Sequence, residues 1–129
     1  MNRILILLPL IFVLNSCIVG KSAQTIEGIK QDVENVAKVN FGPGYKIIYN
    51  KNYDFAAVYN KVKNATTDNL IKIMVYDCKN KDILWGKKAI NAKLEWTGKY
   101  KLRINYLTKA GKPGTIIYDA KSKQVSYLQ

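Results

Sequence analysis

Two runs of alternating apolar and polar residues decide the fold of this chain: AINAKLEW at residues 89–96 and YKLRINYL at residues 100–107. Strict alternation is typical of strands that bury one face and expose the other. A three-residue loop at residues 97–99 pairs Trp96 with Tyr100 and puts both apolar sets on the same face. A two-residue loop would put them on opposite faces. We therefore predict a hairpin with one dry face and one wet face.

The wet face of this hairpin is basic. The same register places Glu95 opposite Lys101, and Lys93 opposite Arg103. Together with Lys99 in the loop, these cations are expected to share one exposed neighbourhood, with two further lysines as additional candidates nearby. The candidate anion-binding residues are therefore Lys87, Lys88, Lys93, Lys99, Lys101 and Arg103.

The rest of the chain predicts one helix followed by short strands. Apolar residues recur at helical spacing over residues 22–40, where Ser22 and Thr25 are candidate caps and Gly42–Gly44 is the stop. After the helix, β-rich runs alternate with turn residues. The eight predicted strands are Tyr45–Tyr49, Tyr53–Val62, Leu70–Asp77, Asp82–Trp85, Ala89–Trp96, Tyr100–Leu107, Thr115–Asp119 and Gln124–Leu128.

The predicted fold class is α+β, with one N-terminal helix packed on an antiparallel β-meander. Residues 22–129 are expected to form this single domain. One helix of about five turns covers only about four strands, so the extra strands must curl or stack. A small β-barrel or a β-sandwich with an N-terminal helix is therefore the alternative.

The N-terminus carries an apolar leader that ends at Cys17. Arg3 precedes an uncharged run at residues 4–14, which is shorter than the roughly 20 residues of a membrane-spanning helix. With the sequence Leu14-Asn15-Ser16-Cys17, the leader resembles the signal peptide and lipobox of bacterial lipoproteins. The resemblance implies that residues 1–16 are removed, that Cys17 carries fatty-acyl chains such as palmitate, and that residues 17–21 form a tether. The alternative is an ordinary secretory leader that is cut further on, after Ala23.

The lipoprotein resemblance also implies a location and a partner. It places the protein in the cell envelope, anchored to a membrane outside the cytoplasm, where no nucleic-acid partner is expected. Ile18 follows the cysteine where the family's inner-membrane retention signal is aspartate, which favours the outer membrane in a Gram-negative source. With Cys17 acylated, Cys78 has no disulfide partner, so we expect it to be a small buried hydrophobe.

Charge separates the helix from the strands. The chain has 21 basic and 9 acidic residues, for a formal net charge of +12, and the excess lies after residue 40. A basic sheet suits an anionic partner, such as phospholipid headgroups, an envelope polymer or an acidic protein. The alternative is a solvated surface produced by a lysine-rich composition.

Catalytic chemistry has little support in the sequence. The chain has no histidine, which excludes Ser–His and Cys–His relays and a histidine-based zinc site. We expect no catalytic residue, no metal and no cofactor. Asp77 and Asp82 flank one turn and form the remaining candidate carboxylate pair for acid-catalysed hydrolysis, although capping of that turn is the simpler interpretation.

The sequence therefore predicts a non-enzymatic envelope lipoprotein. It would bind an anionic envelope component or a protein partner through its basic sheet surface. The alternative is a small inhibitor or immunity-type protein that blocks a specific envelope enzyme, centred on Tyr or Trp anchors. A hydrolase that uses the two aspartates ranks third.

Overall fold

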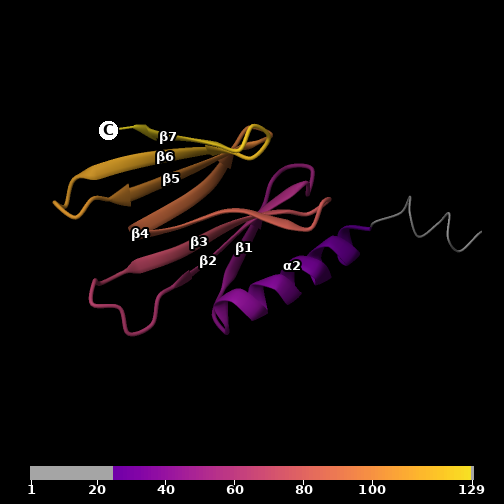
Figure 1. Ribbon diagram of the computed structural model, residues 1–129, viewed down its shortest axis with the longest axis horizontal. Helices are drawn as coiled ribbons and strands as arrows, with labels where there is room; N and C mark the ends of the chain where they lie inside the picture. Colours follow the sequence, from indigo (N-terminus) through magenta and orange to yellow (C-terminus); the bar gives the residue numbers. More distant parts are fainter. Residues whose placement is uncertain (1–24, 129) are drawn as a thin grey trace, which may run out of the picture.

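The computed structural model describes residues 25–128, which form one helix and seven strands (Figure 1). The helix is α2 (Ile26–Phe41). The strands are β1 (Lys46–Tyr49), β2 (Phe55–Lys61), β3 (Leu70–Asp77), β4 (Asp82–Thr97), β5 (Lys101–Leu107), β6 (Pro113–Asp119) and β7 (Gln124–Leu128). The predicted leader, the lipidated Cys17 and the tether lie outside the described residues. No helix of the described part is long and apolar enough to cross a membrane.

The helix begins and ends where the sequence provides signals. The Thr25 hydroxyl accepts a hydrogen bond from the Gly28 backbone N–H at 3.0 Å, and Glu27 lies in the first turn near the positive end of the helix dipole. At the other end, the backbone N–H of Gly42 donates to the Lys38 carbonyl, and Gly42 has φ +70°. Of the two predicted N-cap residues, Ser22 and Thr25, the helix therefore begins at Thr25.

The strands form one sheet in chain order, and every neighbouring pair is antiparallel. The α+β class is thus confirmed in its coarse form, with one helix and an antiparallel sheet that dominates the fold. Within residues 25–128, β1 and β7 do not pair with each other, so the sheet is not closed into a barrel. Its two halves instead fold toward each other (Figure 1), because β4 pairs with β3 along its first part and with β5 along its second.

β4 corrects one prediction. The sequence predicted two strands, Asp82–Trp85 and Ala89–Trp96, whereas the structure has a single strand of 16 residues. Gly86 lies opposite Met74 and continues the pairing with β3 instead of forming a turn. A glycine followed by two lysines resembles a turn in sequence, but here the neighbouring strand holds it in the sheet.

A β-bulge in the middle of β4 keeps its apolar residues on the inner face. Asn91 has φ +52°, and the register with β5 shifts by one residue between Ile90 and Lys93. Ala89 before the bulge and Leu94 after it consequently belong to the same core, although strict alternation would put them on opposite faces. An alternating sequence pattern does not reveal this extra residue.

The β4–β5 hairpin corrects the predicted register by two residues. Trp96 lies opposite Leu102 rather than Tyr100, and the loop comprises residues 98–100. A shift of two preserves the faces, so the distinction between a dry and a wet side holds. The reason is tertiary: the Tyr100 ring packs edge-on against Phe55 at 6.2 Å between centroids, and the Tyr100 carbonyl accepts a hydrogen bond from the Ala120 N–H.

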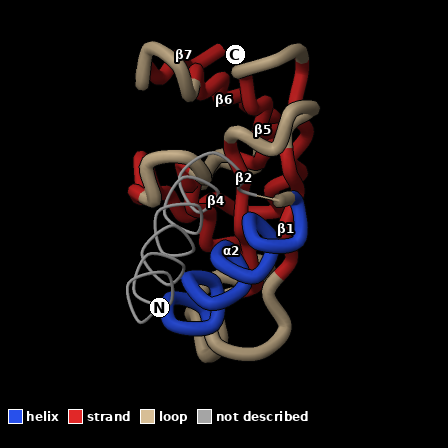
Figure 2. Tube along the Cα trace, turned by 90° about the vertical axis from the view of Figure 1, so that its right-hand side faces the viewer, coloured by secondary structure: helices blue, strands red, loops and turns tan. Residues whose placement is uncertain are grey.

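Two cores lie on the two faces of the sheet. On one face α2 covers β1–β3, with Val33 and Ala37 against residues such as Met74. On the other face the two halves of the sheet cover each other, and Trp85 of β4 stacks on Tyr118 of β6 at 4.9 Å. This second core comprises Ala57, Ile73, Val75, Ala89, Leu102, Ile104, Ile116, Tyr118 and Ala120. Figure 2 shows the resulting arrangement, with α2 beside the β1–β3 half and β6 and β7 at the far end. The strands that the helix does not reach are covered because the sheet curls.

Candidate functional site

Three of the predicted anion-binding residues lie together on the outer face of β4 and β5. Lys93 lies opposite Asn105, Lys101 opposite Thr97, and Arg103 opposite Glu95. The Arg103 guanidinium Nη1 lies 3.2 Å from Glu95 Oε1, so the only arginine of the strands already has an anionic partner. This face has the wet character that the sequence predicts, but one of its three positive charges is neutralised.

The structure separates the other three predicted residues. Lys99 lies in the loop of the hairpin, with its ammonium 5.8 Å from the centroid of the Tyr100 ring. Lys87 lies 5.3 Å from the Tyr127 ring centroid on β7, and Lys88 lies opposite Lys72 of β3. The six candidates are therefore distributed over several surfaces, because the bulge and the curl of β4 turn its two halves in different directions.

A lysine-lined groove of about 310 Å³ lies where α2 ends. Its walls come from the last residues of α2, the end of β2 and the paired strands β3 and β4. We call it the basic groove, and its lining residues are Asn40, Phe41, Asn60, Lys61, Val62, Lys63, Lys72 and Lys88. Four of the eight are lysines and none is acidic. Only Lys88 of this set was a predicted site residue.

The groove brings two like charges together without a carboxylate. Lys72 and Lys88 are register partners on adjacent strands, an arrangement that is destabilising for like charges. The Lys72 ammonium donates to the Asn40 carbonyl at 2.8 Å, at the negative end of the helix dipole, and lies 4.7 Å from the Phe41 ring centroid. Neither of the two ion pairs in the described residues includes a groove lysine. The Lys72 ammonium is therefore stabilised by the Asn40 carbonyl and the Phe41 ring, and not by a carboxylate.

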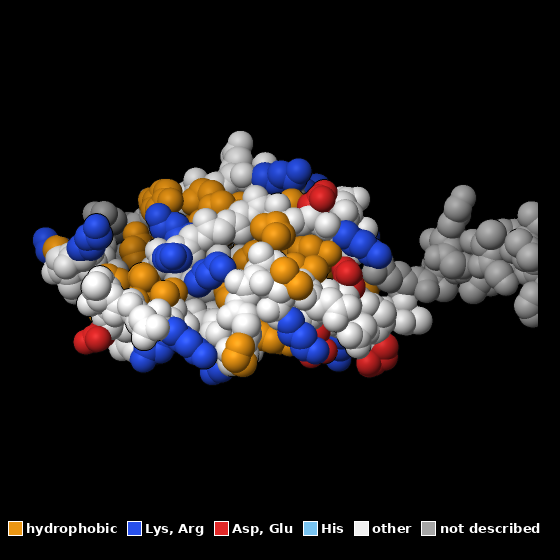
Figure 3. Space-filling view, turned by 60° about the horizontal axis from the view of Figure 1, so that its bottom comes forward, with side chains coloured by type: hydrophobic (Ala, Val, Ile, Leu, Met, Phe, Trp, Pro, Cys, Tyr) orange, Lys and Arg blue, Asp and Glu red, His pale blue; other side chains and the backbone are white. Residues whose placement is uncertain are grey.

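Two further hollows adjoin the groove. A neighbouring hollow shares Asn60, Lys61 and Lys63 with it and extends to Gly44. A third hollow shares Lys72 and Lys88 with it and extends over the apolar Met74 and Ile83 to Lys87, whose ammonium lies over the Tyr127 ring. On the face shown in Figure 3, acidic side chains lie mostly toward the start of the described chain, whereas the charged side chains of the opposite half are mostly Lys and Arg. The hollows thus enlarge the surface beside the groove, while its positive charge lies on the four groove lysines.

Two carboxylates on the acidic side of the molecule have partners of their own. The Tyr76 hydroxyl donates to Asp32 at 2.9 Å, and burial together with this hydrogen bond raises the pKa of Tyr76. Lys79 Nζ lies 3.3 Å from Asp54 Oδ1. Asp32 and Asp54 are therefore held by neighbouring side chains, in contrast to the groove lysines.

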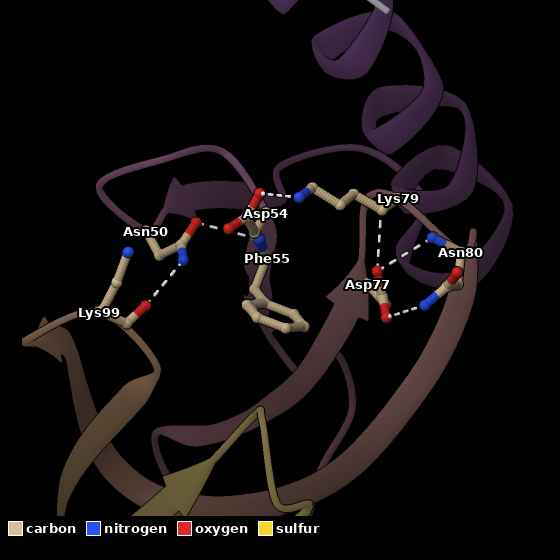
Figure 4. A network of polar contacts seen from close by, with 7 residues as sticks. All are labelled: Asn50, Asp54, Phe55, Asp77, Lys79, Asn80 and Lys99. Atoms are coloured by element: carbon tan, nitrogen blue, oxygen red, sulfur yellow. Dashed lines mark hydrogen bonds and ion pairs between the residues drawn. The ribbon is translucent and has the colours of Figure 1, made fainter. Parts of the chain in front are cut away.

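Of the two aspartates expected to cap the β3–β4 turn, Asp77 does so, while Lys79 pairs with Asp54 and not with either of them. Its Oδ1 accepts hydrogen bonds from the backbone N–H groups of Lys79 and Asn80, each at 3.0 Å, and its Oδ2 accepts one from the Asn80 side chain at 2.9 Å (Figure 4). Asp77 is 8% exposed and lies opposite Asp82 in the register. Both of its oxygens thus hold the β3–β4 turn.

Asn50 joins distant parts of the sheet, and the sequence contains no signal for this role. It is 2% exposed. Its Oδ1 accepts a hydrogen bond from the Phe55 N–H at 3.0 Å, and its Nδ2 donates to the Lys99 carbonyl at 2.8 Å (Figure 4). Nearby, the Trp96 indole N–H donates to the Ile48 carbonyl at 3.0 Å. These contacts fasten the β1–β2 turn to the β4–β5 hairpin on one side of the curled sheet.

Cys78 is a buried part of the core beneath α2. It is 1% exposed and packs with residues such as Val33 and Met74. Burial raises the pKa of the Cys78 thiol to about 12, so the nucleophilic thiolate is disfavoured. The thiol therefore contributes packing, as the sequence predicts.

The fold and the groove define a small α+β protein with an unneutralised lysine-lined surface. Among residues 25–128 no group of three or more Cys, Asp or Glu side chains is placed to hold a metal ion. No protein-family model, curated protein sequence or solved structure matches the chain.

Proposed function

We propose that this protein is a non-enzymatic envelope lipoprotein whose basic groove binds an anionic envelope polymer. The observation that carries the proposal is the pairing of Lys72 with Lys88 in a groove that has four lysines and no carboxylate. Such a pair costs stability in the free protein. A bound anion would relieve this repulsion, which gives the groove an energetic reason to take a negatively charged ligand.

Lysine chemistry and the length of the surface favour a polymer over a small anion. An ammonium on a flexible stem is a point charge, which suits repeated phosphate or carboxylate groups more than bidentate recognition of a single one. The four lysines of the basic groove come from three segments of the chain, and open hollows adjoin the groove on both sides. Several successive anionic units could therefore be bound along it.

The position of the groove favours a polymer over the headgroups of the protein's own membrane. An anchor at Cys17 would precede α2, whereas the basic groove lies at the other end of this helix. The 16 residues of α2 span about 24 Å at the usual rise per residue. The groove of an anchored molecule would thus lie away from the point of attachment.

The salt dependence of binding tests the proposed ligand class. The purified mature chain, held in neutral detergent, is titrated with fluorescent polyphosphate and with polygalacturonate over a range of salt concentrations, and dextran serves as the neutral control. We expect binding of the polyanions alone, with log K falling against log salt with a slope of about 3, because roughly 0.7–0.9 counterions are released per contact. Absence of binding at low salt would contradict the proposal.

The anchor has its own test. We expect the protein expressed in a bacterial host to have an intact mass that begins at Cys17 and includes acyl chains, and to partition with membranes. The Cys17→Ser variant is expected to be shed or uncleaved. An unmodified mass that begins beyond Cys17 would instead indicate free secretion, and binding by the groove would then stand without the anchor.

An inhibitor or immunity-type function is the second candidate. The observation that favours it is the edge strand β7, where Tyr127 is 59% and Leu128 is 53% exposed. Exposed apolar residues on a strand that is the edge of the sheet within residues 25–128 suit the addition of a strand from a partner. A stoichiometric complex with one envelope enzyme that persists at high salt would favour this function over polymer binding.

A further inference from the structure

A hollow of about 370 Å³ lies between the end of α2 and the first half of β4. Its volume lies within the range of small-molecule sites. The hollow shares Lys72 and Lys88 with the basic groove and extends from them over apolar residues. We call it the Gly86 hollow, and the lining residues used below are Asn40, Lys72, Met74, Ile83, Gly86 and Lys88.

The register of β3 with β4 puts these residues on the face of the sheet that carries α2. Met74 packs in the core beneath the helix and lies opposite Gly86. Tyr76 belongs to the same core and lies opposite Ile83. Among the described residues, this core includes none from β4. The helix therefore stops short of β4 and leaves Ile83, which is 53% exposed, uncovered beside it.

Gly86 keeps the hollow open at a position where the backbone does not require glycine. It lies inside a strand of 16 residues, where glycine lowers stability, and it is not among the glycines with positive φ. An added Cβ would lie 3.4 Å from the Ile73 carbonyl oxygen, an ordinary contact, and within 4 Å of no other described residue except its chain neighbours. Glycine inside a strand often marks a place where a ligand approaches closely. The open space above Gly86 is such a place.

The two ends of the Gly86 hollow differ in charge. At one end Lys72 lies opposite Lys88, and the Lys72 ammonium has donors left after its hydrogen bond to the end of α2. At the other end Tyr76, the register partner of Ile83, donates to the Asp32 carboxylate. An anionic group is therefore attracted to the lysine end and repelled from the other. Between these ends the surface is apolar.

We infer that the Gly86 hollow binds a free fatty acid of medium chain length. The carboxylate accepts hydrogen bonds from Lys72 and Lys88, and the alkyl chain lies over Gly86 against Met74 and Ile83. The residue opposite Ile83 is four residues along β3 from Lys72, or about 13 Å, which a chain of roughly ten carbons spans. The inference does not rest on polymer binding, because Met74, Gly86 and Ile83 lie outside the basic groove.

Photolabelling of the mature chain in neutral detergent tests this ligand. The probe is decanoic acid with a diazirine near the end of its chain. The control probe is the corresponding alkyl trimethylammonium, because a neutral micelle takes up both. We expect the acid to label the peptides that contain Met74 and Ile83 at least tenfold more than the cationic probe does. Unlabelled fatty acids should compete roughly two- to fourfold better with each added methylene, up to about ten carbons.

Gly86→Val tests the site without a change in charge. The added side chain fills the hollow, so we expect labelling to fall at least tenfold, whereas the urea midpoint stays the same or rises because valine favours strands. Polyphosphate binding should not change, since Gly86 does not line the basic groove. Gln124→Val is the matched control, because it adds the same side chain at an exposed position of β7. It should be labelled like the wild type.

Should Gly86→Val fail to fold, Ile83→Glu places a carboxylate where the alkyl chain ends, with the same expected loss of labelling. The inference is overturned if the acid labels no more than the cationic probe, or if its label lies outside the hollow. It is also overturned if a folded variant of the hollow is labelled like the wild type. Polyphosphate binding to the same samples then still reports on the basic groove.

Discussion

Replacing Lys61, Lys63, Lys72 and Lys88 together with glutamine is expected to weaken the binding of polyphosphate roughly 100- to 1,000-fold at physiological salt. A lysine near a polyanionic surface contributes about 1 kcal/mol, and about 1.4 kcal/mol corresponds to a factor of ten in affinity. The plot of log K against log salt should flatten as well, because fewer counterions are released. Fluorescence anisotropy measures both effects.

A second quadruple variant controls for total charge. Replacing Lys93, Lys101, Lys109 and Lys112 with glutamine removes the same four charges while leaving the basic groove intact. Its affinity should stay within about threefold of the wild type, since distant exposed charges are largely screened beyond the Debye length of about 8 Å. Equal losses in the two variants would show that net charge, and not the groove, governs binding.

The largest expected effect on stability comes from Asn50→Leu. This substitution removes the partners of the Phe55 N–H and the Lys99 carbonyl, which lie in part-buried hydrogen bonds, and a group left unpaired away from water costs about 1–3 kcal/mol. We therefore expect the free energy of unfolding to fall by roughly 2–5 kcal/mol. Urea unfolding followed by tryptophan fluorescence measures it.

Asn52→Leu is the matched control for this substitution. Asn52 is exposed in the same β1–β2 turn, and we expect a change within about 0.5 kcal/mol. A midpoint for Asn50→Leu equal to that of the wild type would mean that the curled sheet does not depend on the link between the β1–β2 turn and the β4–β5 hairpin.

The elements that the sequence predicted correctly are those with local signals. The helix has a cap at Thr25 and a stop at Gly42, and both act through contacts within a few residues. The bounds of β3 and β7 agree with the predicted runs Leu70–Asp77 and Gln124–Leu128. Each of these runs is preceded by turn residues, so short-range chemistry was sufficient to predict where it begins.

The errors arose where distant contacts override local patterns. The sequence around Asn91 alternates regularly and gives no sign of a bulge, yet the register of β4 shifts by one residue there. Tyr100 looks like the first residue of β5, but its contact with Phe55 keeps it in the loop. The basic groove was not predicted for the same reason, because distant contacts form it. Lys72 meets Lys88 only because β4 continues through residues 86–88, which the sequence did not predict. The sequence shows the excess of basic residues after residue 40. Which of these residues lie together in space depends on the register of the sheet.

The most direct measurement of the central claim is lysine acetylation with and without polyphosphate, followed by peptide mass spectrometry of the mature chain. Binding in the basic groove predicts that Lys61, Lys63, Lys72 and Lys88 become protected, while Lys93 and Lys101 on the outer face keep their reactivity. Protection spread evenly over all of these lysines, or strongest on the outer face, would contradict the claim that the groove is the binding site.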